Sequence, residues 1–205
     1  MGDDSIMAVS SLWAGTGDQT SGLGTDWTGV SYWTGANDGY YESCTISTLW
    51  DSGMSEYFYA YNYGFSIPST ATITKITVDC YCYGSGSVFC NDGHLLHTDR
   101  TPKGDGTPSV SQWPYPAGVV AWTGMSTDLW GVSWTPAQIN DSDFGFYSGI
   151  YTTLPAGGTG YFDAARINVT YTVPGYGNNV CGVTAANISA IFGVARANVS
   201  KVFGA

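Results

Sequence analysis

The stretch Thr72-Ile73-Thr74-Lys75-Ile76-Thr77-Val78-Asp79-Cys80-Tyr81-Cys82-Tyr83 decides the fold class of this chain. Successive side chains of a strand point to opposite faces, so a strand buried on one side alternates apolar and polar residues. Here one face holds Ile76, Val78, Cys80 and Cys82, and the other holds Lys75, Thr77 and Asp79. The pattern predicts a strand with one face in a core and the other in solvent.

Further strand patterns lie on both sides of this stretch. Four segments are rich in aromatic and β-branched residues and are bounded by turn-forming residues: 56–67, 119–134, 144–151 and 167–173. Thr135-Pro136-Ala137-Gln138 indicates a brief helical turn with a capping box. The sequence therefore predicts a mainly β chain, an antiparallel, jelly-roll-like β-sandwich with a short C-terminal helical repeat segment.

Particular side chains are expected at particular places on these strands. The tyrosines at every second position of the first segment, Tyr57, Tyr59, Tyr61 and Tyr63, should share one strand face. Residues 98–118, which are rich in proline and glycine, are predicted to form a loop with at most a short strand. The expected core anchors are Ile76, Val78, Trp130 and Trp134.

Composition suggests four parts along the chain. Residues 1–35 are expected to form an extended N-terminal arm with one or two short strands, anchored by Trp13, Trp27 and Trp33. The other three parts are a β-sandwich domain over residues 36–173, a Pro/Gly linker over 174–179 and a C-terminal docking repeat over 180–205.

The C-terminal part contains two copies of one pattern. Residues 187–194 read Asn-Ile-Ser-Ala-Ile-Phe-Gly-Val, and residues 198–205 read Asn-Val-Ser-Lys-Val-Phe-Gly-Ala. Apolar residues fall at helical spacing, which predicts an apolar stripe on short helices. This apolar face of the repeat either packs on its own sandwich or docks on another chain, and the preceding linker favours docking. The predicted docking residues are Ile188, Ile191, Phe192, Val199, Val202 and Phe203.

Charge and hydrophobicity exclude several classes of partner. The chain has six Lys and Arg residues and a formal net charge of −10, which argues against binding DNA or RNA. No run of apolar residues is long enough for a transmembrane helix. The acidic start, Met1 to Asp4, does not resemble a secretory signal, so we expect synthesis in the cytoplasm.

Little in the sequence points to catalysis or to a metal. Five cysteines and two histidines could nominally supply zinc ligands, but their spacing matches no zinc motif, and buried free thiols are preferred to disulfides or a metal site. No catalytic motif occurs, so we predict no enzyme activity, no catalytic residues, no metal and no cofactor. Exposed Tyr and Trp could stack on sugar rings, although packing in a sandwich core and at subunit contacts is the preferred explanation for these residues.

Three segments carry a resemblance. Residues 65–78, 128–145 and 165–172 resemble segments common in tailed-phage virion proteins, and the Asn-Ile-Ser-x-Ile-Phe-Gly-Val repeat is similar to C-terminal repeats of phage structural proteins. The resemblance implies a virion structural protein with a jelly-roll-like sandwich, made in a host cytoplasm, whose partners are the major capsid or tail protein. It brings no catalytic residues.

These observations give an ordered set of functional hypotheses. The first is a non-enzymatic capsid decoration or cement protein on the particle surface, assembled as a homo-oligomer, with a trimer among the options. A tail or fibre structural protein is the alternative of the same class. A carbohydrate-binding module for host adsorption, with a surface glycan as ligand, is the alternative of a different class.

Overall fold

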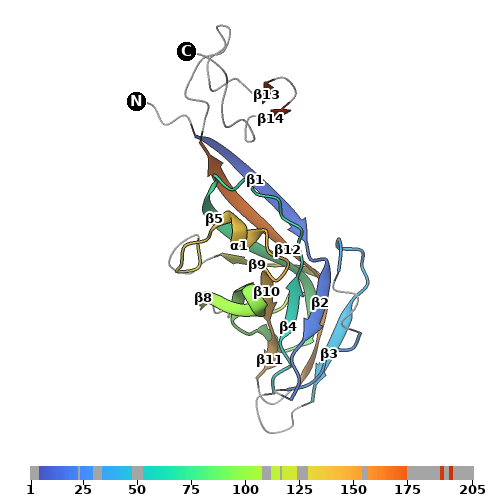
Figure 1. The fold of residues 1–205 in the computed structure, drawn as a ribbon. Helices are drawn as coiled ribbons and strands as arrows, with labels where there is room; N and C mark the ends of the chain where they lie inside the picture. The colour runs from blue at the N-terminus through green and yellow to red at the C-terminus, as the bar shows by residue number, and fades with distance from the viewer. Residues whose placement is uncertain are drawn as a thin grey trace, which may run out of the picture.

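Two antiparallel sheets pack face to face in this computed structural model (Figure 1). The structure describes residues 5–22, 24–29, 34–47, 53–107, 112–115, 117–123, 129–153, 157–174, 190–191 and 194–195. Within this part of the chain, no helix is long and apolar enough to cross a membrane. The mainly β, antiparallel sandwich predicted from the sequence is confirmed.

The first sheet is built on two long strands. In order across the sheet, its strands are β1 (Ile6–Trp13), β12 (Gly158–Val173), β5 (Thr72–Gly86) and β9 (Gly118–Thr123). β3 (Glu42–Ile46) also pairs with β12, along the segment Gly158–Phe162 that β1 leaves unpaired. β5 contains the stretch that opened the sequence analysis, and its burial alternates as the pattern predicts.

The second sheet is built from shorter strands. Its order is β2 (Thr16–Gln19), β4 (Phe58–Tyr61), β10 (Gly145–Ser148), β7 (Gly93–His97) and β8 (Thr101–Thr107). The short 3₁₀ turn η2 (Thr98–Arg100) links β7 to β8, and a separate ladder pairs β11 (Ile150–Thr152) with β6 (Val88–Cys90).

Apolar side chains from the two sheets meet to form the core. Phe58 on β4 contacts Phe162 on β12, with ring centroids 4.3 Å apart. The expected anchors Ile76, Val78, Trp130 and Trp134 are at most 5% exposed. Ring pairs across the interface fix how the sheets face each other, since aromatic contacts prefer particular geometries.

A buried joint connects the segment before α1 (Pro136–Ile139) to the first sheet. The indole N–H of Trp130 donates to the Ile76 carbonyl at 3.0 Å, and Trp130 adopts a left-handed backbone with φ 60°. Asn140 accepts from the Ile67 N–H and donates to the Ile67 carbonyl, both at 2.8 Å. The predicted capping box at Thr135 is present. These residues therefore form structural joints of the fold.

A buried carboxylate holds the segment that follows β2. Glu56 is fully buried, and it accepts a bond from the Gly24 N–H at 2.6 Å and another from the Thr20 hydroxyl. The Trp27 indole donates to the Glu56 carbonyl at 2.9 Å. Buried charge is tolerated where hydrogen bonds satisfy it, so this side chain fixes the path of residues 20–27 across the sandwich edge.

The N-terminal residues are part of the sandwich rather than an arm beside it. β1 pairs with β12 at eight consecutive positions, and β2 pairs with β4 at four. The short strands were expected, but they belong one to each sheet, so the predicted boundary at residue 35 does not separate an arm from the sandwich. Trp27 is buried against Phe58, whereas Trp33 lies outside the described residues.

Other predictions need correction in detail. Tyr63 is buried, unlike Tyr57, Tyr59 and Tyr61, because Asn62 has a left-handed backbone (φ 59°) that breaks the alternation. Residues 129–134 turn around Trp130 and form no strand. The predicted loop over 98–118 contains β8, whose proline is accommodated because β8 is an edge strand.

The helical prediction for the C-terminal repeat fails at the residues that can be tested. β13 (Ala190–Ile191) pairs antiparallel with β14 (Val194–Ala195). β-Branched Ile and Val favour extended backbone, and the Gly between these strands in the sequence is a poor helix residue. The rest of the repeat, and the linker after Pro174, lie outside the described residues.

Candidate functional site

The outer face of the first sheet carries a continuous band of aromatic and polar side chains. On β5, the inward residues Ile76 to Cys82 alternate with four outward residues that span about 20 Å at roughly 3.3 Å per residue. β1 and β12 add their own outward residues beside these. We call this band the stripe, and it consists of Trp13, Thr77, Asp79, Tyr81, Tyr83, Tyr161, Arg166 and Asn168, all partly buried.

A β-bulge in β12 brings both halves of the stripe to one face. Phe162 pairs with Cys82 and Ala164 pairs with Tyr81, so Asp163 is the extra residue between them. In a regular strand of the same sequence, with no bulge, Tyr161 and Arg166 would point to opposite faces, because they are an odd number of positions apart. With the bulge, Tyr161 lies beside Tyr83 and Arg166 lies beside Asp79 on the outer face.

Asp163 itself turns into the protein. It is 1% exposed and accepts a hydrogen bond from the Gly39 N–H at 3.0 Å. Burial raises the pKa of this carboxyl, while backbone hydrogen bonds, including the one from Gly39, oppose the shift. The bond therefore ties the loop before β3 to the bulge at the edge of the stripe.

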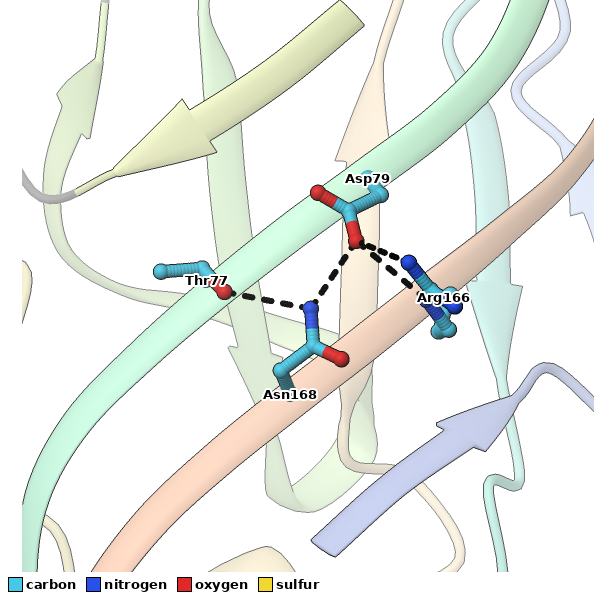
Figure 2. A network of polar contacts seen from close by, with 4 residues as sticks. All are labelled: Thr77, Asp79, Arg166 and Asn168. Carbon is cyan, nitrogen blue, oxygen red and sulfur yellow. Dashed lines mark hydrogen bonds and ion pairs between the residues drawn. The ribbon is translucent and has the colours of Figure 1, made fainter. Parts of the chain in front are cut away.

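One end of the stripe is a polar network, which Figure 2 shows reaching across from β12 to β5. One oxygen of Asp79, Oδ2, accepts from Arg166 Nη2 at 2.8 Å, from Arg166 Nε at 3.2 Å and from Asn168 Nδ2 at 3.0 Å. Asn168 also donates to the Thr77 hydroxyl at 3.2 Å. Within the described part of the chain, all of these bonds use Oδ2, so Oδ1 of Asp79 remains available as an acceptor.

The charges of this network are balanced. The hydrogen bond to Asp79 raises the pKa of Arg166, so the guanidinium stays protonated. A partly exposed pair of this kind stabilises a fold by only about 0.2–1 kcal/mol. The network therefore supplies fixed donors and acceptors with little net charge, and the sandwich does not depend on it for stability.

The other end of the stripe is aromatic. Tyr83 and Tyr161 stack with centroids 4.3 Å apart and an interplanar angle of 7°, and Tyr41 meets Tyr83 edge-on at 4.9 Å. Burial raises the pKa of Tyr83, with smaller contributions from Tyr161 and from Tyr115, which is 78% exposed. The Tyr83 hydroxyl therefore stays protonated at neutral pH and can both donate and accept.

Between the two ends, an indole lies beside the arginine. Trp13 on β1 is 5.2 Å from Tyr81, and the Arg166 guanidinium lies 5.4 Å from the Trp13 ring centroid. Cation–π contact holds the ring in place at a modest gain of about 0.5–1 kcal/mol. The stripe thus runs from a tyrosine cluster, through Trp13 and Tyr81, to the Asp79 network.

The outer face of the second sheet also carries aromatic residues, but they cover one another. Tyr147 stacks on His94 at 4.9 Å and on Tyr59 at 5.4 Å, and Tyr57 meets it edge-on. The His94 ring lies against Gly106, where any Cβ would clash with it. Burial raises the pKa of Tyr147 to about 12 and lowers that of His94. These rings form a cross-strand ladder that stabilises the sheet, and the ladder consists of Tyr57, Tyr59, His94 and Tyr147.

The residues predicted to dock on a partner are not brought to this site. Ile188, Phe192, Val199, Val202 and Phe203 lie outside the described residues, and Ile191 is known only as part of β13. Their docking role stays a prediction.

The nominal zinc ligands do not gather either. Cys44, Cys80, Cys82 and Cys90 are buried free thiols, and burial raises the pKa of Cys44 to about 12. His94 lies in the ladder, and His97 contacts Thr101. Among the described residues, no group of three or more His, Cys, Asp and Glu side chains could hold a metal ion.

Comparisons with known proteins name no family. No family model matches the chain, and no curated protein matches it. One solved chain that matches is described as "CBM4 structure and function"; it is 10% identical, and the match covers 78% of this chain and 89% of that chain with a TM-score of 0.27. A likeness at that TM-score carries no argument about function.

Proposed function

We propose that this protein is a non-catalytic binding module that holds carbohydrate on the stripe of its first sheet. The observation that carries the proposal is the joining of aromatic rings and a fixed polar network on one outer sheet face. The C–H faces of sugar rings pack on aromatic rings, while their hydroxyls need donors and acceptors at fixed positions. The aromatic rings are those of Tyr83, Tyr161 and Trp13. The donors and acceptors are those of Asp79, Arg166 and Asn168.

The charges favour a neutral glycan over an acidic one. Arg166 is already paired with Asp79 at 2.8 Å, so it offers no uncompensated positive charge to a carboxylate or sulfate. The chain as a whole carries −10 and repels polyanions. The stripe runs for about 20 Å along β5, which suits an extended chain of several sugar units better than a single sugar.

A glycan array followed by calorimetry tests the proposal. We expect binding to a neutral polysaccharide or oligosaccharide, with little dependence on salt concentration. Tyr83→Ala and Arg166→Ala should each weaken binding by about tenfold or more. The matched control is Tyr147→Ala, which removes a tyrosine from the opposite face and should leave affinity unchanged. Absence of binding to any neutral glycan, or equal losses in all three variants, contradicts the proposal.

The resemblance to phage virion proteins supports a second candidate, a capsid decoration protein or a tail or fibre protein. The supporting observation is the set of segments around Ile67, Trp130 and Asn140, which resemble virion proteins and form the joints described above. Because those residues are buried joints, they support a shared architecture more than a position in a particle. Copies per virion, counted by mass spectrometry, separate the options: hundreds indicate capsid decoration or a tail tube, and about 3–18 indicate a tail-tip or collar part.

A further inference from the structure

β1 is the edge of the first sheet over its whole length. It pairs with β12 from Ile6 to Trp13 without a register shift, and in the described part of the chain no other strand pairs with it. Figure 1 shows β1 running along the border of the sheet beside β12. An edge strand presents a row of backbone N–H and C=O groups that can pair with another strand.

The sequence of β1 has none of the features that usually prevent an edge strand from pairing with another chain. Ile6-Met7-Ala8-Val9-Ser10-Ser11-Leu12-Trp13 has no charge, no proline and no glycine, and it is eight residues long. Two of its outward side chains are large, apolar and exposed: Met7 is 71% exposed and Val9 is 62% exposed. A long, straight, uncharged edge of this kind is a predicted pairing site.

Both edges of the second sheet differ from β1 in this respect. β2 has only four residues, and one of them is Asp18, which forms an ion pair with Arg100. β8 contains Pro102 and Lys103, and its register shifts against β7. The same chain thus protects these two edges with charge, proline and a bulge. β9, the other edge of the first sheet, also lacks charge and proline, but it has six residues and includes Gly118, so β1 is the longer uncharged edge.

We propose that a second copy of this chain pairs antiparallel with the β1 edge, forming a two-fold dimer with one continuous sheet. A two-fold axis perpendicular to the sheet relates the two β1 strands, so the contact is self-complementary and closes at two copies. Outward residues then face outward residues, and Met7 and Val9 cover their counterparts. No like charges meet on these strands, whereas the net charge of −10 opposes contact through most other surfaces.

The dimer would place both stripes on the same side of the joined sheet. The axis perpendicular to the sheet turns each copy within the plane and does not flip it. Trp13 belongs both to β1 and to the stripe, so each stripe reaches the contact at Trp13. A polymeric ligand could then touch two stripes at once and gain avidity. The pairing itself does not depend on what the stripe binds, and mass measurements test it separately.

Sedimentation equilibrium of the full chain from roughly 1 to 200 µM tests the proposal. We expect a monomer–dimer equilibrium that strengthens with added salt, because salt screens the net negative charge. Val9→Lys should weaken dimerisation by about tenfold or more, since the two-fold axis brings two lysines close together. Val9 is mostly exposed, so this variant should keep its fold, and circular dichroism checks that it does.

Thr72→Lys is the matched control. Thr72 is an exposed residue of β5, separated from β1 by β12, and the change adds the same charge without touching the edge. It should leave the dimerisation constant within about twofold of the original. The proposal is overturned if the chain stays monomeric throughout, or if the two variants behave alike. Growth beyond the dimer would also overturn it, because that result indicates open pairing of β1 with β9.

Discussion

Replacing Glu56 with alanine should unfold the protein at a markedly lower temperature. The buried carboxylate accepts hydrogen bonds from the Gly24 N–H and the Thr20 hydroxyl. Alanine removes both acceptors and leaves the two donors, which belong to the half-buried Thr20 and the exposed Gly24, without their partner. The change tests whether residues 20–27 are held by this one side chain or by apolar packing alone.

The magnitude follows from those two bonds. An orphaned buried donor costs about 1–3 kcal/mol; because both donors lie on residues that are at least partly exposed, the lower bound applies, and the two together cost about 2 kcal/mol before any cavity is counted. For a chain of this size, each kcal/mol lowers Tm by about 2–4 °C, which gives a loss of about 4–8 °C. Glu56→Gln keeps a carbonyl oxygen for the Gly24 N–H and should therefore lose less than half as much.

Thermal unfolding followed by circular dichroism or calorimetry measures both variants. The expected order of Tm is the original chain, then Glu56→Gln, then Glu56→Ala. A loss below about 1 kcal/mol for Glu56→Ala would refute the reasoning, because it would mean that the donors find water or other acceptors at no cost. A glutamine variant as unstable as the alanine variant would show that the negative charge, not the acceptor geometry, is what matters.

Three further outcomes are expected. Burial raises the pKa of Glu42, so protonation of this carboxyl favours the folded state. Its contribution to stability is complete below the ordinary carboxyl pKa of about 4.3 and is lost as the pH rises through the raised pKa. When Tm is measured against pH, Glu42→Gln should therefore gain less on acidification than the original chain does. Gly106→Ala should lower Tm, because the new Cβ meets the His94 ring, and His94→Ala should restore it; no rescue would place the strain elsewhere. In a Cys181→Ser variant, a thiol reagent should label the four remaining cysteines only after denaturation, because all are buried; rapid labelling of the native chain would contradict their placement.

The sequence was sufficient for the fold class because its strongest signal is local. The alternation over residues 72–83 depends only on the two faces of a strand, and the capping box at Thr135 depends only on four neighbouring residues. Burial of Trp130 and Trp134 follows from their size and apolar character. These features need no knowledge of distant partners, so they can be predicted from one sequence.

The stripe could not be predicted in the same way. Tyr161 and Arg166 share a face only because Asp163 forms a bulge, and nothing in the local sequence marks that position. The left-handed backbone of Asn62, which turns Tyr63 inward, is likewise fixed by tertiary contacts. The polar residues Thr77 and Asp79 were placed on the outer face of their strand, but their partners come from β12, nearly ninety positions away.

The N-terminal boundary was wrong for a related reason. A Gly- and Thr-rich composition over residues 1–35 is typical of loops, and the pairing of β1 with β12 is a contact between the two ends of the described sandwich. Pairing at such sequence distance leaves little trace in local patterns. The alternation of β1 is also weak, because Ser10 and Ser11 interrupt its apolar residues.

The bulge at Asp163 shifts the inward–outward alternation of side chains along β12 by one residue. Deleting Asp163 would leave Tyr161 and Arg166 four positions apart, so β12 would pair one-to-one with β5 and both side chains would stay on the outer face. The deletion would remove the bulge, the buried Asp163 carboxylate and its bond from the Gly39 N–H. A single deletion among the paired residues on either side of the bulge would instead turn the following residues to the opposite face, so it should be far less tolerated than deletion of Asp163.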